Sequence, residues 1–295
     1  MRPTSIAKPT SDQAGFSLIE LLLATILSTM IVVVFVSALL TMVRTATAQK
    51  TQLELTGQGQ LALDIVERDI RLATSFDTTI PTQFTDSYGP SMTTSGWSGT
   101  WSYKGSDAAN RVLILSQIAT TTPPLSDTRT PVYVRSSTSN PYGQPTIFNC
   151  TPYSEATPYG SLSQNYRLPY YFVYFVRDNT LYRRTLTDTT TSLCNGPQYQ
   201  KRSCPREDIH KPTGCLAHDE IIVRDVSRFT IAYYQHESRS SQPYLNFLDL
   251  NVYDSNSPNI FDEANSVVVT LGLEKKVNGE PQNSELSVRV GRVNP

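Results

Sequence analysis

Four cysteines are the residues whose types most readily suggest chemistry. They form an even set in the second half of the chain: Cys150, Cys194, Cys204 and Cys215. An even set is typical of disulfides in a segment outside the cytoplasm, and four cysteines permit three pairings. Zinc is the alternative because His210 and His218 lie nearby, but zinc-binding cysteines are usually separated by about two to four residues. Nine and ten residues separate the last three cysteines. We therefore expect disulfides and no metal.

A carboxylate-rich stretch and three histidines are further candidates for metal binding or catalysis. Residues 254–263, from Asp254 to Glu263, supply oxygen ligands of the kind that calcium prefers. Their spacing is not that of an EF-hand, and a polar turn is the simpler interpretation. A hydrolase needs a nucleophile beside a positioned base, and His210, His218 and His236 lie in no such sequence context. The sequence therefore predicts no enzyme and no cofactor.

Aromatic residues offer two possible binding surfaces, each with a simpler structural explanation. Trp97 and Trp101 lie among glycines and could stack on a sugar or a nucleic-acid base, but burial as packing anchors is the default expectation. The run from Tyr170 to Phe175 is most simply a central strand with both faces covered.

One carboxylate, Glu20, lies at the start of a long apolar run. Residues 21–43 contain no Asp, Glu, Lys, Arg or His, and as a helix they measure about 35 Å, enough to cross a hydrocarbon core of about 30 Å. A cleaved signal peptide has a shorter apolar region of about 7 to 15 residues. A charge inside a bilayer costs about 2.5 to 3.5 kcal/mol, so Glu20 needs a partner or a place in the headgroup layer.

The overall charge excludes one class of function. The 295 residues contain 25 Lys and Arg against 26 Asp and Glu, with no basic block. Bulk electrostatic binding to nucleic acid is therefore not indicated. A hydrophobic content of 39% argues against a wholly disordered chain, although much of it is concentrated in the apolar run.

The residues from Gly15 to Leu22, Gly-Phe-Ser-Leu-Ile-Glu-Leu-Leu, resemble the prepilin signature of type IV pilins and type II secretion pseudopilins. The resemblance implies that a prepilin peptidase removes residues 1–15 as a leader, cutting after Gly15. It also implies that Phe16 becomes the N-methylated mature terminus and that Glu20 is the family's characteristic carboxylate. In a filament Glu20 would pair with the amino group of Phe16 on a neighbouring subunit, which gives a buried carboxylate its cation.

The elements that must position these residues follow from the residue pattern. No proline interrupts the chain between Phe16 and Ile80, so we expect one long helix. Residues 16–43 form its transmembrane and assembly part, and residues 44–75 an amphipathic continuation. A stripe of Ala62, Leu63, Val66, Ile70 and Ala73, widened by Leu61 and Ile65, would face the core, with Asp64, Glu67, Arg68, Asp69 and Arg71 on the solvated face. The pairs Asp64 with Arg68 and Glu67 with Arg71 are spaced for helical ion pairs.

A β-rich domain, residues 76–295, is predicted after the helix. Short apolar runs indicate strands at residues 111–118, 131–135, 170–177, 180–186, 220–226, 228–236, 244–253, 266–274 and 284–290. Asp178-Asn179 indicates a tight hairpin between two of them. No second long helical pattern occurs, so the first helix must cover one face of the sheet. The fold class is α+β, a pilin-like long helix packed on an antiparallel sheet.

Weaker resemblances narrow the family. Residues 61–71, 221–234 and 264–271 are similar to segments of PilW-like minor pilins and of the J-type pseudopilin. Residues 76–215 match no family pattern, and a binding specificity could be located there. The implied partners are other pilin subunits, a prepilin peptidase and an inner-membrane assembly platform.

The sequence favours a non-enzymatic minor pilin, an initiating or tip subunit, with a possible role in adhesion, twitching motility or DNA uptake. It would be a single-pass membrane protein with its domain outside the cytoplasm, and then part of a surface pilus or a periplasm-spanning pseudopilus. A J-type pseudopilin of a type II secretion system is one alternative. A membrane-anchored extracellular binding protein that never polymerises is the other.

Overall fold

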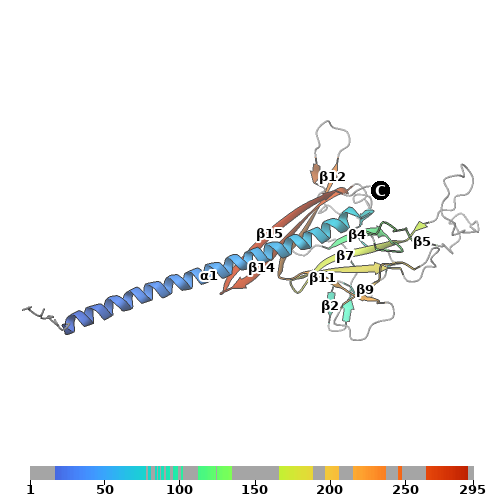
Figure 1. Ribbon diagram of the computed structural model, residues 1–295. Coiled ribbons are helices and arrows are strands. Elements are labelled where there is room, and N and C mark those ends of the chain that lie inside the picture. Colours follow the sequence, from blue (N-terminus) through green and yellow to red (C-terminus); the bar gives the residue numbers. More distant parts are fainter. Residues whose placement is uncertain are drawn as a thin grey trace, which may run out of the picture. The chain divides into compact units, whose positions relative to one another are not determined.

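The computed structural model describes residues 17–77, 79–80, 84, 86, 88–89, 91–93, 96–98, 101, 112–123, 125–134, 166–188, 197–205, 215–236, 245–247 and 264–291. The chain divides into two compact units, Met1–Thr51 and Gln52–Pro295. Helix α1, Leu18–Arg71, contributes to both (Figure 1). It is helical at Gly57 and Gly59, although each glycine costs about 1 kcal/mol relative to alanine.

The larger unit contains two main antiparallel sheets. The first has the order β1-β4-β7-β8-β11 and consists of β1 Ser75–Asp77, β4 Leu113–Ile118, β7 Pro169–Arg177, β8 Thr180–Thr187 and β11 Glu220–Val223. The second has the order β13-β12-β14-β15 and consists of β13 Leu245–Phe247, β12 Val226–His236, β14 Ala264–Val277 and β15 Glu280–Gly291. The predicted antiparallel α+β architecture is confirmed.

Three two-stranded ribbons complete the described strands. They pair β2 Ser91–Thr93 with β3 Gly96–Ser98, β5 Tyr133–Val134 with β6 Tyr166–Arg167, and β9 Ser203–Cys204 with β10 Ala217–His218. The last pair is parallel.

Two tight turns fix the register of the longest hairpins. Asp178 and Asn179 both have positive φ, 48° and 55°, which matches a type I′ turn between β7 and β8 and confirms the predicted hairpin. Asn278 and Gly279, with φ of 54° and 87°, join β14 to β15 in the same way. Because the two strands continue up to this turn, β14 ends later and β15 begins earlier than the predicted strands 266–274 and 284–290.

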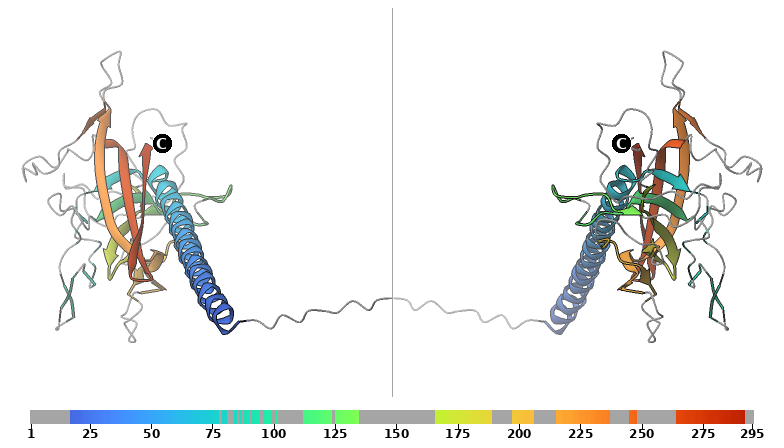
Figure 2. Two further views of the ribbon diagram at one scale, coloured as in Figure 1. Left: turned by 90° about the vertical axis from the view of Figure 1, so that its left-hand side faces the viewer. Right: turned by 90° about the vertical axis from the view of Figure 1, so that its right-hand side faces the viewer.

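The main core lies between α1 and one face of the sheets. Leu55, Ala62, Leu63, Val66 and Ile70 of α1 are buried against apolar residues of β4, β7, β12 and β14. Thr56 and Ser284 of β15 are 3.1 Å apart between their hydroxyl oxygens. Both views of Figure 2 place this cyan part of α1 beside the red strand β15. The helix therefore covers the sheet, as the stripe predicts.

The opposite face of the five-stranded sheet has its own smaller core. Tyr171, Val173 and Phe175 of β7 are buried there with Phe84 and Trp101. Tyr170, Phe172 and Tyr174 of the same strand belong to the main core. Strand β7 is the middle strand of its sheet and has both faces covered, as predicted.

Two details of the helix prediction are wrong. Leu61 does not widen the core stripe, because its side chain is 67% exposed. Asp69 does not lie on the solvated face, because it is buried at 3% exposure. Arg71 pairs with Glu67 at 2.6 Å as predicted, whereas Arg68 pairs with Asp69 and not with Asp64.

Candidate functional site

The first candidate site is the apolar segment of α1, residues 18–43. Every residue from Ser17 to Thr47 is exposed. The large apolar side chains between Leu18 and Val43 are 46% to 84% exposed. Within the described part of the chain, α1 is the one helix long and apolar enough to cross a membrane.

The exposed area of this segment requires a covering environment. Burying one large apolar side chain contributes about 1.5 to 3 kcal/mol, and roughly eighteen such side chains occur in the segment. Full coverage therefore contributes on the order of tens of kcal/mol, far more than the net stability of an ordinary domain. A lipid bilayer or other apolar helices can supply this coverage.

The threonine hydroxyl groups of the segment form hydrogen bonds with backbone carbonyl oxygens of the same helix. Thr25 and Thr29 donate hydrogen bonds to the carbonyl oxygens of Leu22 and Ile26, each at 2.8 Å. Thr41 donates to the carbonyl oxygen of Ser37 at 2.9 Å. Such bonds within the helix let hydroxyl groups lie in an apolar environment without other partners. Glu20 is the one ionisable group in the segment.

Glu20 lies in the first turn of α1, and its carboxylate caps the beginning of the helix. The backbone N–H of Ser17 donates a hydrogen bond to Oε2 of Glu20 at 3.1 Å, and the N–H of Leu21 donates to the carbonyl of Ser17 at 3.2 Å. Serine before the helix and glutamate three residues later form the spacing of a capping box. A carboxylate has further acceptor sites, so this bond leaves Glu20 able to accept a second partner. Gly15 and Phe16 lie outside the described residues.

The structure places only some of the other predicted site residues. Cys204 and Cys215 form a disulfide, which excludes both as thiolate zinc ligands. Cys150, Cys194, His210 and residues 254–263 lie outside the described residues. His218 is exposed in β10. Among the residues that the structure describes, no group of three or more His, Cys, Asp or Glu side chains is placed to hold a metal ion.

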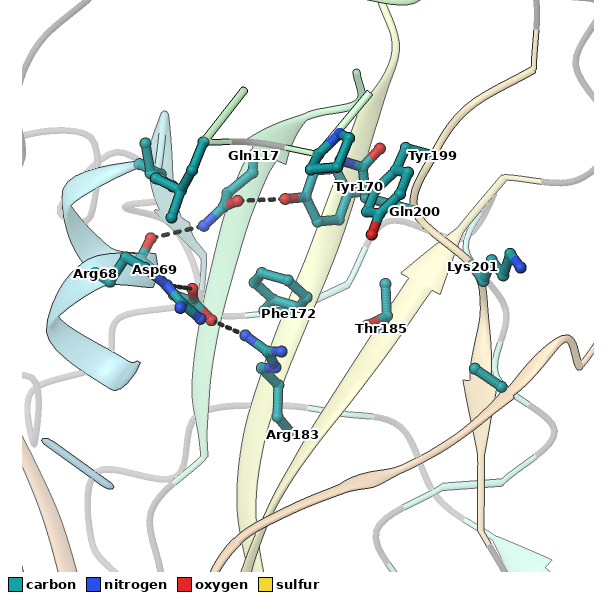
Figure 3. A pocket seen from close by; sticks show the side chains of 14 residues that line it. Arg68, Asp69, Gln117, Tyr170, Phe172, Arg183, Thr185, Tyr199, Gln200 and Lys201 are labelled. Atoms are coloured by element: carbon teal, nitrogen blue, oxygen red, sulfur yellow. Dashed lines mark hydrogen bonds and ion pairs between the residues drawn. The ribbon is translucent and has the colours of Figure 1, made fainter. Parts of the chain in front are cut away.

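Asp69 joins the end of α1 to the five-stranded sheet, and sequence analysis missed this role. Its Oδ2 accepts a hydrogen bond from the Tyr174 hydroxyl at 2.6 Å. The same oxygen forms an ion pair with Arg183 (Figure 3), and Arg183 also pairs with Glu220. The guanidinium of Arg183 lies 4.5 Å from the ring centroid of Phe172. Burial and then the nearby Asp69 carboxylate raise the pKa of Tyr174, so its hydroxyl remains a donor.

A second buried ion cluster lies on the opposite face of the same sheet. Arg184 is fully buried and pairs with Asp219 at 2.6 Å and Asp86 at 2.7 Å. Burial alone would lower the pKa of Arg184, but the hydrogen bonds and charges of these two carboxylates outweigh it and raise that pKa. Trp101 donates from Nε1 to Asp86 at 2.7 Å and is 3% exposed, so it is a packing anchor and not a stacking surface. Adjacent strand residues point to opposite faces, which explains the separate roles of Arg183 and Arg184.

A cavity of about 460 Å³ opens beside the Asp69 cluster. Figure 3 shows Phe172 in the middle of its lining, between Arg183 and the Tyr170–Gln117 pair. Gln117 donates to the backbone carbonyl of Asp69 at 2.6 Å and accepts from the Tyr170 hydroxyl. Arg68, Arg183 and Lys201 line this cavity together with Asp69, and Arg183 is paired with both Asp69 and Glu220.

Comparisons with known proteins give one likeness. The chain matches no protein-family model, and it matches no curated protein. Among solved structures it is similar to a type IV-like pilin from Thermus thermophilus, with 8% sequence identity and a TM-score of 0.34. That alignment covers 81% of this chain and 97% of the other. At these values the likeness says nothing about the function of this chain.

Proposed function

We propose that this protein is a non-enzymatic subunit of a type IV pilus or a related filament, anchored in the membrane and assembled through the apolar segment of α1. The observation that carries the proposal is an exposed apolar helix with a single carboxylate in its first turn. A bilayer covers the segment before assembly, and the helices of other subunits cover it afterwards.

The role of Glu20 separates a filament subunit from a simple membrane anchor. A simple anchor gains from Glu20 only the hydrogen bond at the start of α1, and the charge costs about 2.5 to 3.5 kcal/mol near the middle of a bilayer and less near its surface. A filament subunit gains an ion pair with the amino terminus of Phe16 on its neighbour. The hydrogen bond from Ser17 uses one oxygen of Glu20 and leaves the other for that amino group.

The finer assignment is a minor subunit that initiates the filament or lies at its tip, of the PilW-like type. Its support is the size of the larger unit, Gln52–Pro295, which is bulky for a domain repeated at close spacing. Prepilin peptidase and an inner-membrane assembly platform are the partners that such a subunit requires. A J-type pseudopilin would have the same helix and a similar domain, and genes for secretion components beside its own would favour it.

Substituting Glu20→Gln tests assembly without disturbing the helix. Glutamine can replace glutamate in a capping box, so the bond to Ser17 is retained and only the charge is lost. Leaving the amino group of Phe16 unpaired in an apolar interface costs about 3 to 5 kcal/mol. We expect at least tenfold less protein in the sheared filament fraction, with unchanged amounts in the membrane.

The matched control is Glu54→Gln, which removes a carboxylate from an exposed position of the same helix. This variant should be incorporated normally. Equal incorporation of Glu20→Gln and the unaltered protein would refute the pairing of Glu20 with a neighbouring subunit.

A further inference from the structure

Strand β15 is a long sheet edge that pairs on one side only. It contains 12 residues and is the last strand in the order β13-β12-β14-β15. The other edge strands of the two main sheets, β1, β11 and β13, contain three or four residues each. Natural proteins usually keep edge strands short, bulged or rich in lysine, because an open edge pairs with other chains. β15 contains no lysine, and its ladder with β14 has no register shift.

The hairpin determines which residues of β15 face this edge. Val277 and Glu280 flank the two-residue turn, and a pair in this position exchanges backbone hydrogen bonds. Hydrogen-bonded and non-hydrogen-bonded pairs then alternate along the antiparallel ladder. Pro281 falls in a non-hydrogen-bonded pair, which agrees with its lack of an N–H group. The N–H and C=O groups that point away from β14 are those of Asn283, Glu285, Ser287, Arg289 and Gly291.

These outward-pointing groups have no partner within the chain. Beyond its ladder with β14, no residue of β15 makes a backbone hydrogen bond with the part of the chain that the structure describes. The side chains of Glu285 and Arg289 contact their own sheet only at its solvent face. Glu285 lies 3.7 Å from Arg228, with both side chains more than half exposed, and the guanidinium of Arg289 lies 4.8 Å from the ring centroid of Tyr234. Exposed contacts of this kind are weak, so both charges can pair with another chain.

The charges along this edge match those of a second copy in the antiparallel direction. When a two-fold axis passes through Ser287, Glu285 of each copy lies opposite Arg289 of the other. Axes through Glu285 or Arg289 would place like charges opposite each other, which is unfavourable in a sheet. Parallel pairing in register would likewise bring each charge beside its own copy. The antiparallel arrangement centred on Ser287 therefore gives two ion pairs.

The apolar side chains of β15 match in the same register. Leu286 and Val288 pack against the main core but are only half-buried. With the axis through Ser287, Leu286 of each copy lies opposite Val288 of the other. Pairing therefore covers apolar surface in addition to completing the backbone hydrogen bonds of the edge.

We propose that the edge of β15 binds a second copy of this chain in an antiparallel pairing centred on Ser287. The interface is isologous, because each copy contributes the same edge. It joins the two four-stranded sheets into one continuous sheet.

The direction of α1 determines which copies can pair. Thr56 lies beside Ser284 and Gly59 lies beside Leu286, so α1 and β15 run in the same direction. The two-fold axis therefore gives the helices of the two copies opposite directions. Copies anchored in one membrane share a single direction, so the pairing joins copies in facing membranes or in filaments that run in opposite directions. This last step rests on the proposed function, whereas the pairing itself does not and is tested separately from Glu20.

Charge reversal tests the pairing, measured by sedimentation velocity of the full chain in an excess of detergent micelles. Glu285→Arg and Arg289→Glu each place like charges opposite each other at both ion pairs, and each should weaken dimerisation at least tenfold. An equimolar mixture of the two variants restores opposite charges at both positions and should recover the dimer. This recovery distinguishes loss of pairing from a folding defect. A monomeric unaltered chain, a mixture that stays monomeric, or dimers that persist in each variant alone would overturn the proposal.

A cysteine at the two-fold axis tests the register. Opposite Cα atoms of a hydrogen-bonded antiparallel pair lie about 5.5 Å apart, within the range of about 4.4 to 6.8 Å that a disulfide spans. Mild oxidation should therefore cross-link Ser287→Cys into a dimer on a non-reducing gel. Asn283→Cys is the matched control, because it lies in the same row of β15 but more than about 20 Å from its counterpart in the other copy. Equal cross-linking of the two variants, or none of Ser287→Cys, would contradict this register.

Discussion

Replacing Asp69 with asparagine should destabilise the larger unit more than any other single change of charge in α1. The side chain of Asp69 is 4% exposed and that of Arg183 is 15% exposed. Asparagine keeps the shape but brings an amide donor to a site surrounded by the donors of Tyr174, Arg68 and Arg183. Removing one partner of a buried ion pair costs about 3 to 5 kcal/mol.

The lower end of that range applies here. Arg183 retains its ion pair with Glu220, whose side chain is 49% exposed and therefore partly screened by water. We expect Asp69→Asn to lower the free energy of unfolding by about 3 kcal/mol. For a unit of this size, that corresponds to a melting temperature lower by about 6 to 12 °C.

The assay is urea and thermal unfolding of the full chain in detergent, followed by circular dichroism of the sheet signal. Asp64→Asn is the matched control, because Asp64 is exposed on the same helix and makes no ion pair within the described residues. The control should change stability by less than about 0.5 kcal/mol. Adding Arg183→Met to Asp69→Asn should restore part of the loss, since it removes the guanidinium that has lost its buried partner and keeps only the partly exposed Glu220. A loss below about 1 kcal/mol for Asp69→Asn would refute the role of this cluster.

Two further predictions concern the helix and the buried tyrosines. Gly57→Ala should stabilise the larger unit by about 1 kcal/mol in urea unfolding, because an added Cβ meets no atom within 4 Å. Gly59→Ala should lack this gain, because its Cβ would overlap Cδ1 of Leu286; an equal gain at both glycines would contradict this packing. Burial, and then Asp77, raise the pKa of Tyr171 to about 12, above the value of about 10 in an unfolded chain. Its contribution to stability is therefore complete below pH 10 and is lost as the pH rises from 10 to 12, which an alkaline titration followed by tyrosinate absorbance and circular dichroism will detect. Ionisation of every tyrosine near pH 10 with the sheet signal intact would contradict that prediction.

Local patterns in the sequence predicted much of the fold. The period of the apolar stripe identified the buried face of α1, and the apolar and aromatic run from Tyr170 to Phe175 identified β7 as a strand covered on both faces. Both features depend on neighbouring residues, which a sequence displays directly. The turn at Asp178-Asn179 was recognisable for the same reason.

The ends of β14 and β15 were harder to predict. The predicted strands 266–274 and 284–290 stop short of each other, although Asn278-Gly279 between them is a strong hairpin signal. The structure pairs Lys276 with Pro281. Proline is tolerated there because β15 lies at the edge of its sheet, where one side of the strand needs no partner.

The buried ion clusters could not be predicted from local patterns. Asp69 and Arg183 are 114 residues apart in the sequence, and Asp86 and Arg184 are 98 apart. A charged residue at a helical position is normally solvated, and only the fold brings its partner close. In contrast, the motif around Glu20 is contiguous and can be recognised in the sequence itself.

Mass spectrometry of the mature amino terminus tests the filament assignment most directly. Protein isolated from the membrane of its native host should begin at N-methylated Phe16, with residues 1–15 removed. A mature terminus at Met1, at Gln49 after signal-peptidase cleavage, or at any residue other than Phe16 would contradict processing as a pilin and the assembly role built on it.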